Sequence, residues 1–337
     1  MPESKFKTAA VLGSGSWGTA LAIVLGERGL DTTIYGIEEQ ALDDINQNHR
    51  NARYLPDIDL PENISATSRL EDITDAPIIL LVVPSQVARL VIKQLQQAGV
   101  SKNTIFLACT KGIESSTGLS MTQLLREFFP DNPIAALSGP THAEEVARRM
   151  ATATVIGCPD HDTAVCLQEV FTLPWFRSYT REDMEGIEIG ATVKNVFAIA
   201  AGIADGLGLG DNAKAAMVTR GLAEMIRLGT ALGGKASTFQ GLSGVGDLIV
   251  TCYSRHSRNN SFGRMIGEGL TVEETLKKMT QVAEGLPNTE SVYKLAKKTG
   301  VRTPLIDQIY AVLYENKPAQ EALGELLNRD PRTEGDS

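Results

Sequence analysis

The sequence predicts an α/β protein with a Rossmann-like, doubly wound parallel sheet, followed by an all-α C-terminal domain. Short apolar runs alternate with helix-like segments over about the first 140 residues. A glycine-rich turn, GSGSWG, joins the first run to the first helix. Beyond Ile187 only helical segments remain, which places a boundary near Met184 and predicts domains 1–184 and 185–337.

The first four elements form a βαβ unit with one further helix. Thr8–Leu12 is a short apolar run, and Thr19–Gly29 carries apolar residues at helical spacing. Asp31–Gly36 is the second expected strand. Glu38–Arg50 is a polar helix whose first turn is acidic, which the helix dipole favours.

Three more strands are expected at Ile78–Val83, Thr104–Cys109 and Ile134–Leu137. They are short, apolar and without polar alternation, as in a parallel sheet that is covered on both faces. The loops that follow them are Val83–Ser85, Thr110–Gly112 and Ser138–Thr141. Because ligands of such sheets bind beyond the carboxyl ends of the strands, these loops should line one crevice with the glycine turn.

The second half is predicted to be helical. The expected helices are Ile189–Ala204, Asn212–Leu228, Thr271–Thr280, Ser291–Thr299 and Leu305–Tyr314. Glycine-rich loops are expected at 202–210 and 241–246, and the last seven residues should fray. Burial within the domain and packing against a second subunit, as in a homodimer, both explain the apolar residues of 212–228.

Composition excludes several classes of protein. The net charge of −9 argues against a broadly basic surface for nucleic acid. The four cysteines form no CxxC pair and the histidines are scattered, so we expect free thiols in a reducing cytoplasm and no metal site. No segment approaches the roughly 18 apolar residues of a membrane span, and the polar start does not resemble a signal peptide.

The glycine turn predicts a dinucleotide. Gly13 would permit the tight turn, Gly15 would let the backbone approach a pyrophosphate, and Gly18 would allow the helix to pack closely on the strand. A merely structural turn explains only one of the three glycines well. Just past the second strand, Glu38 could accept a hydrogen bond from the ribose 2′-hydroxyl, but Glu38 and Glu39 could equally serve the helix dipole. Since neither interpretation supplies a cation for a 2′-phosphate, NAD is favoured over NADP.

Lys194 is the only charged residue between Glu188 and Asp205, on an otherwise apolar helix. It could be a snorkelling lysine with an apolar stem. A lysine desolvated near other cations would instead release its proton readily, as a general acid for carbonyl reduction must. Asp247 could form an ion pair with this lysine.

The segment from Ser254 to Asn260 has the composition of a cationic helix amino terminus, which suits a phosphate. For Arg255 and Arg258, a solvated run of charges is an equal alternative.

Together these residues resemble the bacterial type of NAD(P)-dependent glycerol-3-phosphate dehydrogenase, over nearly the whole chain. The motifs that carry the resemblance are Gly13–Leu21, Val83–Ser85, Thr110–Gly112, Ser138–Thr141, Val193–Asn195, Thr219–Leu222, Gly246–Leu248 and Ser257–Asn259. The family interconverts dihydroxyacetone phosphate and sn-glycerol 3-phosphate, which supplies the glycerol backbone of phospholipids.

The resemblance also implies roles for individual residues. The cofactor would be bound by Ser16, Trp17, Lys111, Ala143, Arg258, Val282 and Glu284, in addition to the three glycines and Glu38. The substrate would be bound by Lys111, Gly139, Thr141, Lys194, Asp247, Ser257, Arg258 and Asn259, with Asn195 and Thr251 as further members of the site. Lys194 would exchange the proton, and Lys111 would lie between cofactor and substrate and help to stabilise the developing oxyanion.

One position departs from the family pattern. Bacterial members often carry His or Arg just after the second strand, where this chain has Ile37 and Glu38, so we expect NADH to be used at least as well as NADPH. Two other classes of function remain open: a related dehydrogenase acting on another hydroxy acid, and an NAD-binding sensor without catalysis. The first would not need the phosphate-binding turn, and the second would not need Lys194.

Overall fold

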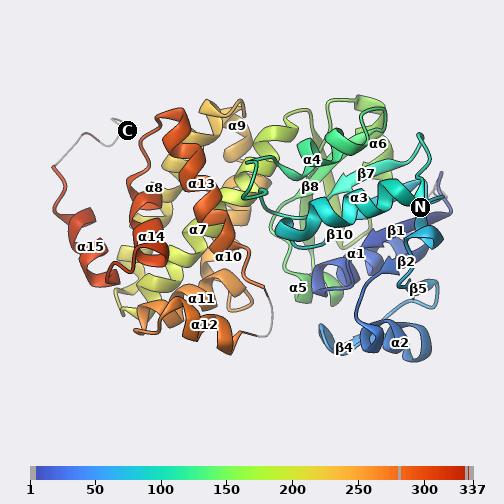
Figure 1. Cartoon of the computed structure of the whole chain (residues 1–337), viewed down its shortest axis with the longest axis horizontal. Helices are drawn as coiled ribbons and strands as arrows, with labels where there is room; N and C mark the ends of the chain where they lie inside the picture. Colours follow the sequence, from blue (N-terminus) through green and yellow to red (C-terminus); the bar gives the residue numbers. More distant parts are fainter. Residues whose placement is uncertain (1–4, 280–281, 331–332, 334–337) are drawn as a thin grey trace. The chain divides into compact units, whose positions relative to one another are not determined.

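The computed structural model describes residues 5–279, 282–330 and 333 of the chain. These residues form two compact units (Figure 1). The first unit contains Met1–Lys111 and Leu119–Met184, and the second contains Gly112–Gly118 and Glu185–Ser337. A short segment from the middle of the first unit's sequence therefore packs with the second unit.

The first unit is built on an eight-stranded sheet with the order β10-β9-β8-β7-β6-β1-β2-β5. Its strands are β1 (Thr8–Leu12), β2 (Asp31–Tyr35), β5 (Ile64–Thr67), β6 (Ile78–Leu81), β7 (Ile105–Ala108), β8 (Ile134–Ser138), β9 (Thr152–Gly157) and β10 (Phe176–Arg181). Neighbouring strands are parallel except β8 and β9, which are antiparallel. The predicted Rossmann-like class is thus confirmed, with one antiparallel pair.

Helices cover both faces of this sheet. They are α1 (Ser16–Glu27), α2 (Glu39–Asn48), α3 (Ala88–Ala98), α4 (Met121–Phe128), α5 (Ala143–Ala147) and α6 (His161–Val170), with 3₁₀ turns η1 (Leu70–Ile73) and η2 (Ser85–Val87). In β1, Ala9 and Val11 pack into one apolar cluster, and Ala10 and Leu12 into another. Since successive side chains of a strand point to opposite faces, this strand is apolar throughout because both of its faces are buried.

Several strands of this unit were not expected. These are β5, β9, β10 and a small antiparallel hairpin formed by β3 (Arg50–Asn51) and β4 (Leu55–Asp59). The first four residues of β10 alternate between buried and exposed, and β5 has only four residues, two of them polar. Both lie at edges of the sheet, where a strand needs less apolar sequence, so neither forms a continuous apolar run.

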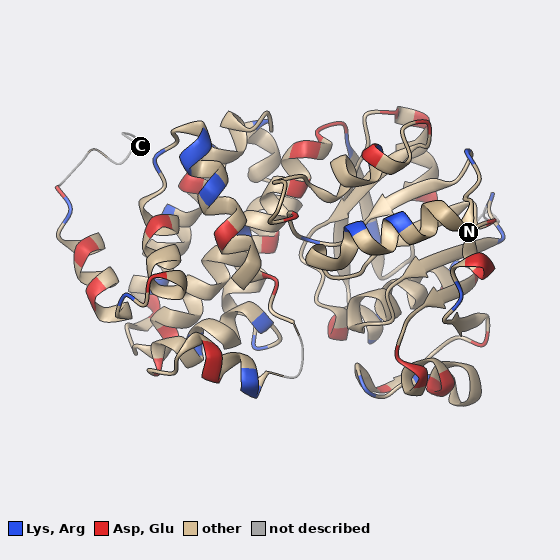
Figure 2. Ribbon diagram, in the orientation of Figure 1, with Lys and Arg blue, Asp and Glu red and all other residues tan. Residues whose placement is uncertain are grey.

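The second unit is helical, as predicted. Its helices are α7 (Met184–Gly206), α8 (Gly210–Ala231), α9 (Ala236–Phe239), α10 (Asp247–Tyr253), α11 (Arg258–Gly267), α12 (Val272–Lys278), α13 (Gly285–Thr299), α14 (Pro304–Tyr314) and α15 (Ala319–Leu327). The apolar residues Val218, Met225 and Leu228 of α8 are buried in the core of this unit. Basic and acidic residues are interspersed along both units (Figure 2).

Three expected boundaries in this unit were wrong. The glycines at 202–210 do not form one long loop, because α7 continues to Gly206 and α8 begins at Gly210. The glycines at 241–246 form a π-helical turn, η3 (Leu242–Gly246), that leads into α10. Helix α13 begins at Gly285, because glycine and proline are accepted in a first helical turn. Thr280 and all but one of the last seven residues lie outside the described residues.

Helix α7 corrects the expectation that no segment has the length and composition of a membrane span. It is 23 residues long, and the most apolar window in it has a mean hydropathy of 1.4. That window is 94% buried within the protein, so α7 is the core helix of the second unit. A helix buried all round its circumference has the same apolar composition as a helix in a membrane.

Glycines hold α7 against α11 at backbone contact. A Cβ atom at Gly202 would lie 2.0 Å from the Asn260 carbonyl oxygen, and one at Gly263 would lie 2.0 Å from the Ile199 carbonyl oxygen. One helical turn further along, a Cβ at Gly206 would lie 2.3 Å from the Arg264 carbonyl oxygen, and one at Gly267 would lie 2.4 Å from the Ile203 carbonyl oxygen. These glycines therefore allow two helices to touch.

Replacing Gly263 with Ala should strongly destabilise the second unit. The new methyl group would overlap the backbone of α7, so we expect the upper end of the usual overpacking cost, about 3 kcal/mol. We expect the midpoint of thermal unfolding to fall by about 6–12 °C. Gly324→Ala is the control, because a Cβ there meets no described atom within 4 Å and alanine favours the helix by up to about 1 kcal/mol. An unchanged midpoint for Gly263→Ala would contradict the packing.

A buried carboxylate joins α8 to α14. Glu224 accepts hydrogen bonds from the backbone nitrogens of Leu305 at 2.8 Å and Ile306 at 3.2 Å, in the first turn of α14. Burial raises the pKa of Glu224 to about 7, although both hydrogen bonds act in the opposite direction. This side chain caps α14 from a distant part of the sequence.

Candidate active site

Each of the three glycines in the turn between β1 and α1 is required for a different structural reason. Gly13 has φ of +127°, and a Cβ there would lie 3.0 Å from the backbone of Val82 at the end of β6. A Cβ at Gly18 would lie 1.9 Å from the Gly13 carbonyl oxygen, so α1 packs directly on the turn. A Cβ at Gly15 would meet no described atom within 4 Å. Gly15 therefore leaves open space over the turn.

That space suits the pyrophosphate of a dinucleotide. Gly15 is the N-cap of α1, its cap has no side-chain hydrogen bond, and the described first turn contains no acidic residue. The positive end of the helix dipole can therefore act on an anion. Ser16 and Trp17 begin α1, and the Trp17 indole nitrogen donates to the carbonyl oxygen of Cys109 at 3.1 Å, which ties α1 to the end of β7.

Asn51 supports the glycine turn and was missed by sequence reasoning. Its side chain is fully buried and donates to the Ser14 carbonyl oxygen and to Thr19 Oγ1, both at 2.8 Å. It lies in the unpredicted hairpin, far from the turn in the chain. An isolated asparagine has no sequence pattern that indicates such a contact.

Glu38 lies just beyond β2, as expected, but it has two partners that were not foreseen. It accepts a hydrogen bond from the Tyr54 hydroxyl at 2.8 Å and forms an ion pair with Arg53 at 3.3 Å. Burial and the hydrogen bond to Glu38 raise the pKa of Tyr54. Neither sequence interpretation of Glu38 supplied a cation for a 2′-phosphate, and the hairpin brings Arg53 to this carboxylate.

The loops after β7 and β8 meet as predicted. Lys111 Nζ donates to the Gly139 carbonyl oxygen at 2.8 Å and to Thr141 Oγ1 at 3.2 Å. Thr110 Oγ1 donates to the Val83 carbonyl oxygen at 2.7 Å, which holds this loop to the loop after β6. Ala143 begins α5 beside them and is buried. The expected residues of the first unit thus gather at the carboxyl edge of the sheet.

In the second unit Lys194 is buried with an anion. It is 5% exposed, and its Nζ donates to Asp247 Oδ1 at 2.7 Å and to Thr251 Oγ1 at 2.6 Å. Thr251 Oγ1 in turn donates to the Asp247 carbonyl oxygen at 2.6 Å. The expected ion pair is present. Snorkelling does not describe this lysine, because its ammonium group ends in a buried cluster.

The first turn of α11 is held by hydrogen bonds to several elements. Ser257 is its N-cap and accepts from the Asn260 backbone nitrogen at 3.1 Å. Asn259 donates to Asn195 Oδ1 on α7 at 2.9 Å and accepts from the Gly285 backbone nitrogen at 2.9 Å. Arg258 is exposed at the start of the same turn. A helix amino terminus that carries an arginine and has no acidic residue in its described first turn suits a phosphate.

Val282 and Glu284 lie just before α13, and Val282 is 54% exposed. Because Gly285 is bonded to Asn259, this segment is next to the first turn of α11. Within the part of the chain that the structure describes, no group of three or more His, Cys, Asp or Glu side chains could hold a metal ion. All four cysteines are free thiols.

Comparison with known proteins shows the family of the chain. Residues 8–164 match the family model of the NAD-dependent glycerol-3-phosphate dehydrogenase N-terminus, and residues 183–324 match that of its C-terminus. A Clostridium botulinum protein named glycerol-3-phosphate dehydrogenase [NAD(P)+] is 44% identical over 324 residues, with 96% of this chain and 98% of the relative covered. A Fusobacterium nucleatum protein of the same name is 45% identical over 328 residues, covering 96% and 98%.

A solved structure is similar over the whole length. The crystal structure of glycerol-3-phosphate dehydrogenase from Coxiella burnetii is 38% identical, with a TM-score of 0.92, and the match covers 97% of this chain and 100% of that one.

Proposed function

The chain belongs to the NAD-dependent glycerol-3-phosphate dehydrogenase family, and on this premise we propose that Lys194 is the general acid and base of its reaction. The chain is an oxidoreductase that uses NAD or NADP. The observation that carries the proposal is the buried cluster of Lys194, Asp247 and Thr251 on α7 and α10.

The role of Lys194 follows from the charge that develops on the substrate. When bound, NADH or NADPH would supply a hydride to C2 of dihydroxyacetone phosphate. As the C–H bond forms, the electron pair of the carbonyl bond moves to oxygen, and Lys194 donates the proton that gives the hydroxyl group. Asp247 and Thr251, which are hydrogen-bonded to each other, both accept from the ammonium group and orient it. In the reverse direction, the neutral amine accepts the same proton.

The remaining site residues would bind and orient the substrate and the cofactor. The first turn of α11, with Ser257, Arg258 and Asn259, would bind the substrate phosphate, because it offers a helix amino terminus and a guanidinium group. Lys111, held by Gly139 and Thr141, would contact both ligands and help to stabilise the oxyanion. The glycine turn, Ser16, Trp17 and Ala143 would bind the cofactor, together with Val282 and Glu284. Fixing both reactants makes the reaction effectively intramolecular.

The test is oxidation of the reduced cofactor by the purified chain with dihydroxyacetone phosphate. Turnover with this substrate and not with a 2-oxo acid supports the proposal. Turnover only with the carboxylate would indicate a hydroxy acid dehydrogenase, and cofactor binding without turnover would indicate a sensor.

Glu38 should set the preference between the two cofactors. Its carboxylate suits the ribose 2′-hydroxyl of NADH and repels a 2′-phosphate, while Arg53 beside it offers a phosphate some compensation. We expect wild type to use NADH at least as well as NADPH. Glu38→Gln should raise kcat/KM for NADPH about five- to tenfold and leave that for NADH nearly unchanged.

Glu39→Gln is the matched control, since Glu39 is an exposed acidic residue in the first turn of the same helix. This substitution should alter kcat/KM neither for NADH nor for NADPH. If wild type strongly prefers NADPH, or if both variants behave alike, the assignment of Glu38 is wrong.

We place this activity in the cytoplasm, where reducing conditions suit the free thiols, and propose that it supplies glycerol 3-phosphate for glycerophospholipid synthesis. A strain that depends on this chain should then require added glycerol for phospholipid synthesis when the chain is depleted.

A further inference from the structure

A second buried lysine has no part in this mechanism. Among the described residues only Lys194 and Lys214 are buried lysines, and Lys214, on α8, is 8% exposed. A buried ammonium group is costly unless it is paired and hydrogen-bonded. Its partners therefore show what it does.

The ammonium group of Lys214 binds both oxygens of one carboxylate. Its Nζ lies 2.9 Å from Asp205 Oδ1 and 2.7 Å from Asp205 Oδ2, at the end of α7. The same Nζ lies 4.7 Å from the centre of the Tyr253 ring on α10. Lys214 thus connects three helices of the second unit.

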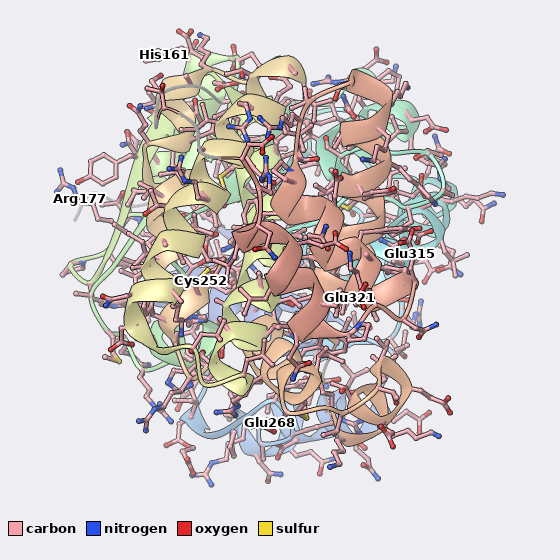
Figure 3. All side chains as sticks on the ribbon, turned by 90° about the vertical axis from the view of Figure 1, so that its left-hand side faces the viewer. His161, Arg177, Cys252, Glu268, Glu315 and Glu321 are labelled. Atoms are coloured by element: carbon pink, nitrogen blue, oxygen red, sulfur yellow. The ribbon has the colours of Figure 1, made fainter. Side chains whose placement is uncertain are left out.

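Asp205 carries this connection on to the expected phosphate-binding turn. Asn260 Nδ2, in the first turn of α11, donates to Asp205 Oδ2 at 3.1 Å and to the Cys252 carbonyl oxygen at 3.0 Å. Cys252, at the carboxyl end of α10, is labelled in Figure 3. The backbone nitrogen of Asn260 donates to Ser257, the N-cap of that turn. One side chain therefore links Asp205 to the turn.

Helix α11 contacts α7 through its backbone at the position of Asn260. Since a Cβ at Gly202 would lie 2.0 Å from the Asn260 carbonyl oxygen, Asn260 sits directly on α7 with no side chain between them. Asn260 Nδ2 donates both to the Cys252 carbonyl oxygen and to Asp205, so the Asp205 carboxylate is one of the two acceptors that orient this side chain.

We propose that Lys214 is a positioning residue: through Asp205 and Asn260 it fixes the first turn of α11 in the orientation that binds the substrate phosphate. This inference rests on the proposed function of that turn. Without the ammonium group, the Asp205 carboxylate loses its charged partner and turns toward water, so Asn260 Nδ2 loses one of its two acceptors and the turn is held less firmly. A shift of about 1 Å in a binding group can cost a hundredfold in rate.

The experiment compares a substrate that has the phosphate with one that lacks it. Lys214→Met should lower kcat/KM for dihydroxyacetone phosphate about ten- to one hundred-fold, mainly through KM, and leave kcat/KM for dihydroxyacetone unchanged. Lys214→Arg, which can still bind the carboxylate, should recover most of the loss. sn-Glycerol 3-phosphate should raise the thermal unfolding midpoint of Lys214→Met less than that of wild type.

Lys297→Met is the matched control. Lys297 pairs with Asp307 at 3.0 Å and lies 4.9 Å from the centre of the Tyr293 ring, so it has the same kinds of partner in the same unit. Lys297 lies on α13, and its substitution should leave the ratio of kcat/KM for dihydroxyacetone phosphate to kcat/KM for dihydroxyacetone unchanged.

The double variant Lys214→Met with Asp205→Leu removes both charges of the buried pair. If Lys214→Met does not fold, this double variant takes its place in the test. It should show the same selective loss, because Asn260 then has no carboxylate to bind. Equal losses with both substrates, or no loss, in a folded variant would overturn the inference. Inactivity of wild type toward dihydroxyacetone phosphate would instead refute the proposed function.

Discussion

Replacing Lys194 with Met should lower kcat for the reduction of dihydroxyacetone phosphate by about a thousandfold or more. General acid catalysis by a positioned side chain contributes about 10²–10⁴ in rate, and Met cannot donate a proton. Met preserves the length of the side chain and its packing on α7. Binding of NADH, measured by fluorescence titration, should be retained, because the expected nucleotide residues lie mostly on the first unit.

The single variant carries a stability cost that must be separated from its chemical effect. Lys194→Met removes the cationic partner of the Asp247 carboxylate, which is 1% exposed, and breaking a buried ion pair in this way costs about 3–5 kcal/mol. The double variant Lys194→Met with Asp247→Leu also removes the remaining charge and should regain most of the thermal stability without regaining activity. A Lys194→Met protein with turnover within tenfold of wild type would reject the assignment.

Arg258→Met should raise KM for dihydroxyacetone phosphate about one hundred-fold, with a smaller change in kcat. The guanidinium group is the charge that the first turn of α11 offers to the phosphate, and charge-assisted hydrogen bonds contribute about 1.5–3 kcal/mol each. Steady-state kinetics with varied substrate at saturating NADH would measure the change.

Arg255→Met controls for the loss of an exposed positive charge in the same segment. Arg255 lies three positions before the start of α11 and is exposed, like Arg258. From the sequence, either arginine could be merely a solvated surface charge. Its KM should stay within twofold of wild type. Equal effects of the two variants would mean that only the general charge of the segment attracts the substrate.

Much of the fold was predictable because its signals are local. Strands β1, β6, β7 and β8 are continuous apolar runs, since both of their faces are covered. The glycine turn was recognisable because a strand, three spaced glycines and a helix occur together. Residues that follow such strands, including Lys111 and Gly139, were expected in one place because parallel strands end at one edge.

Glycines in the second half were misread for a physical reason. A glycine favours a turn because it tolerates positive φ, and it also allows close approach because it has no Cβ. Gly208 has φ of +68°, which fits a turn, whereas Gly202 and Gly206 are helical and face α11. Only the partner helix distinguishes the two uses.

By itself, the sequence determined the fold class, the two kinds of domain and the residues expected at the site, including the lysine on an apolar helix. The ion pair of Lys194 with Asp247 was expected from the sequence, but other contacts of the site were decided by the tertiary structure alone. Arg53 reaches Glu38 through an unpredicted hairpin, and Lys214 reaches the first turn of α11 through Asp205 and Asn260. The reason is that periodicity and spacing report on neighbours along the chain, whereas an ion pair depends on packing that brings distant segments together.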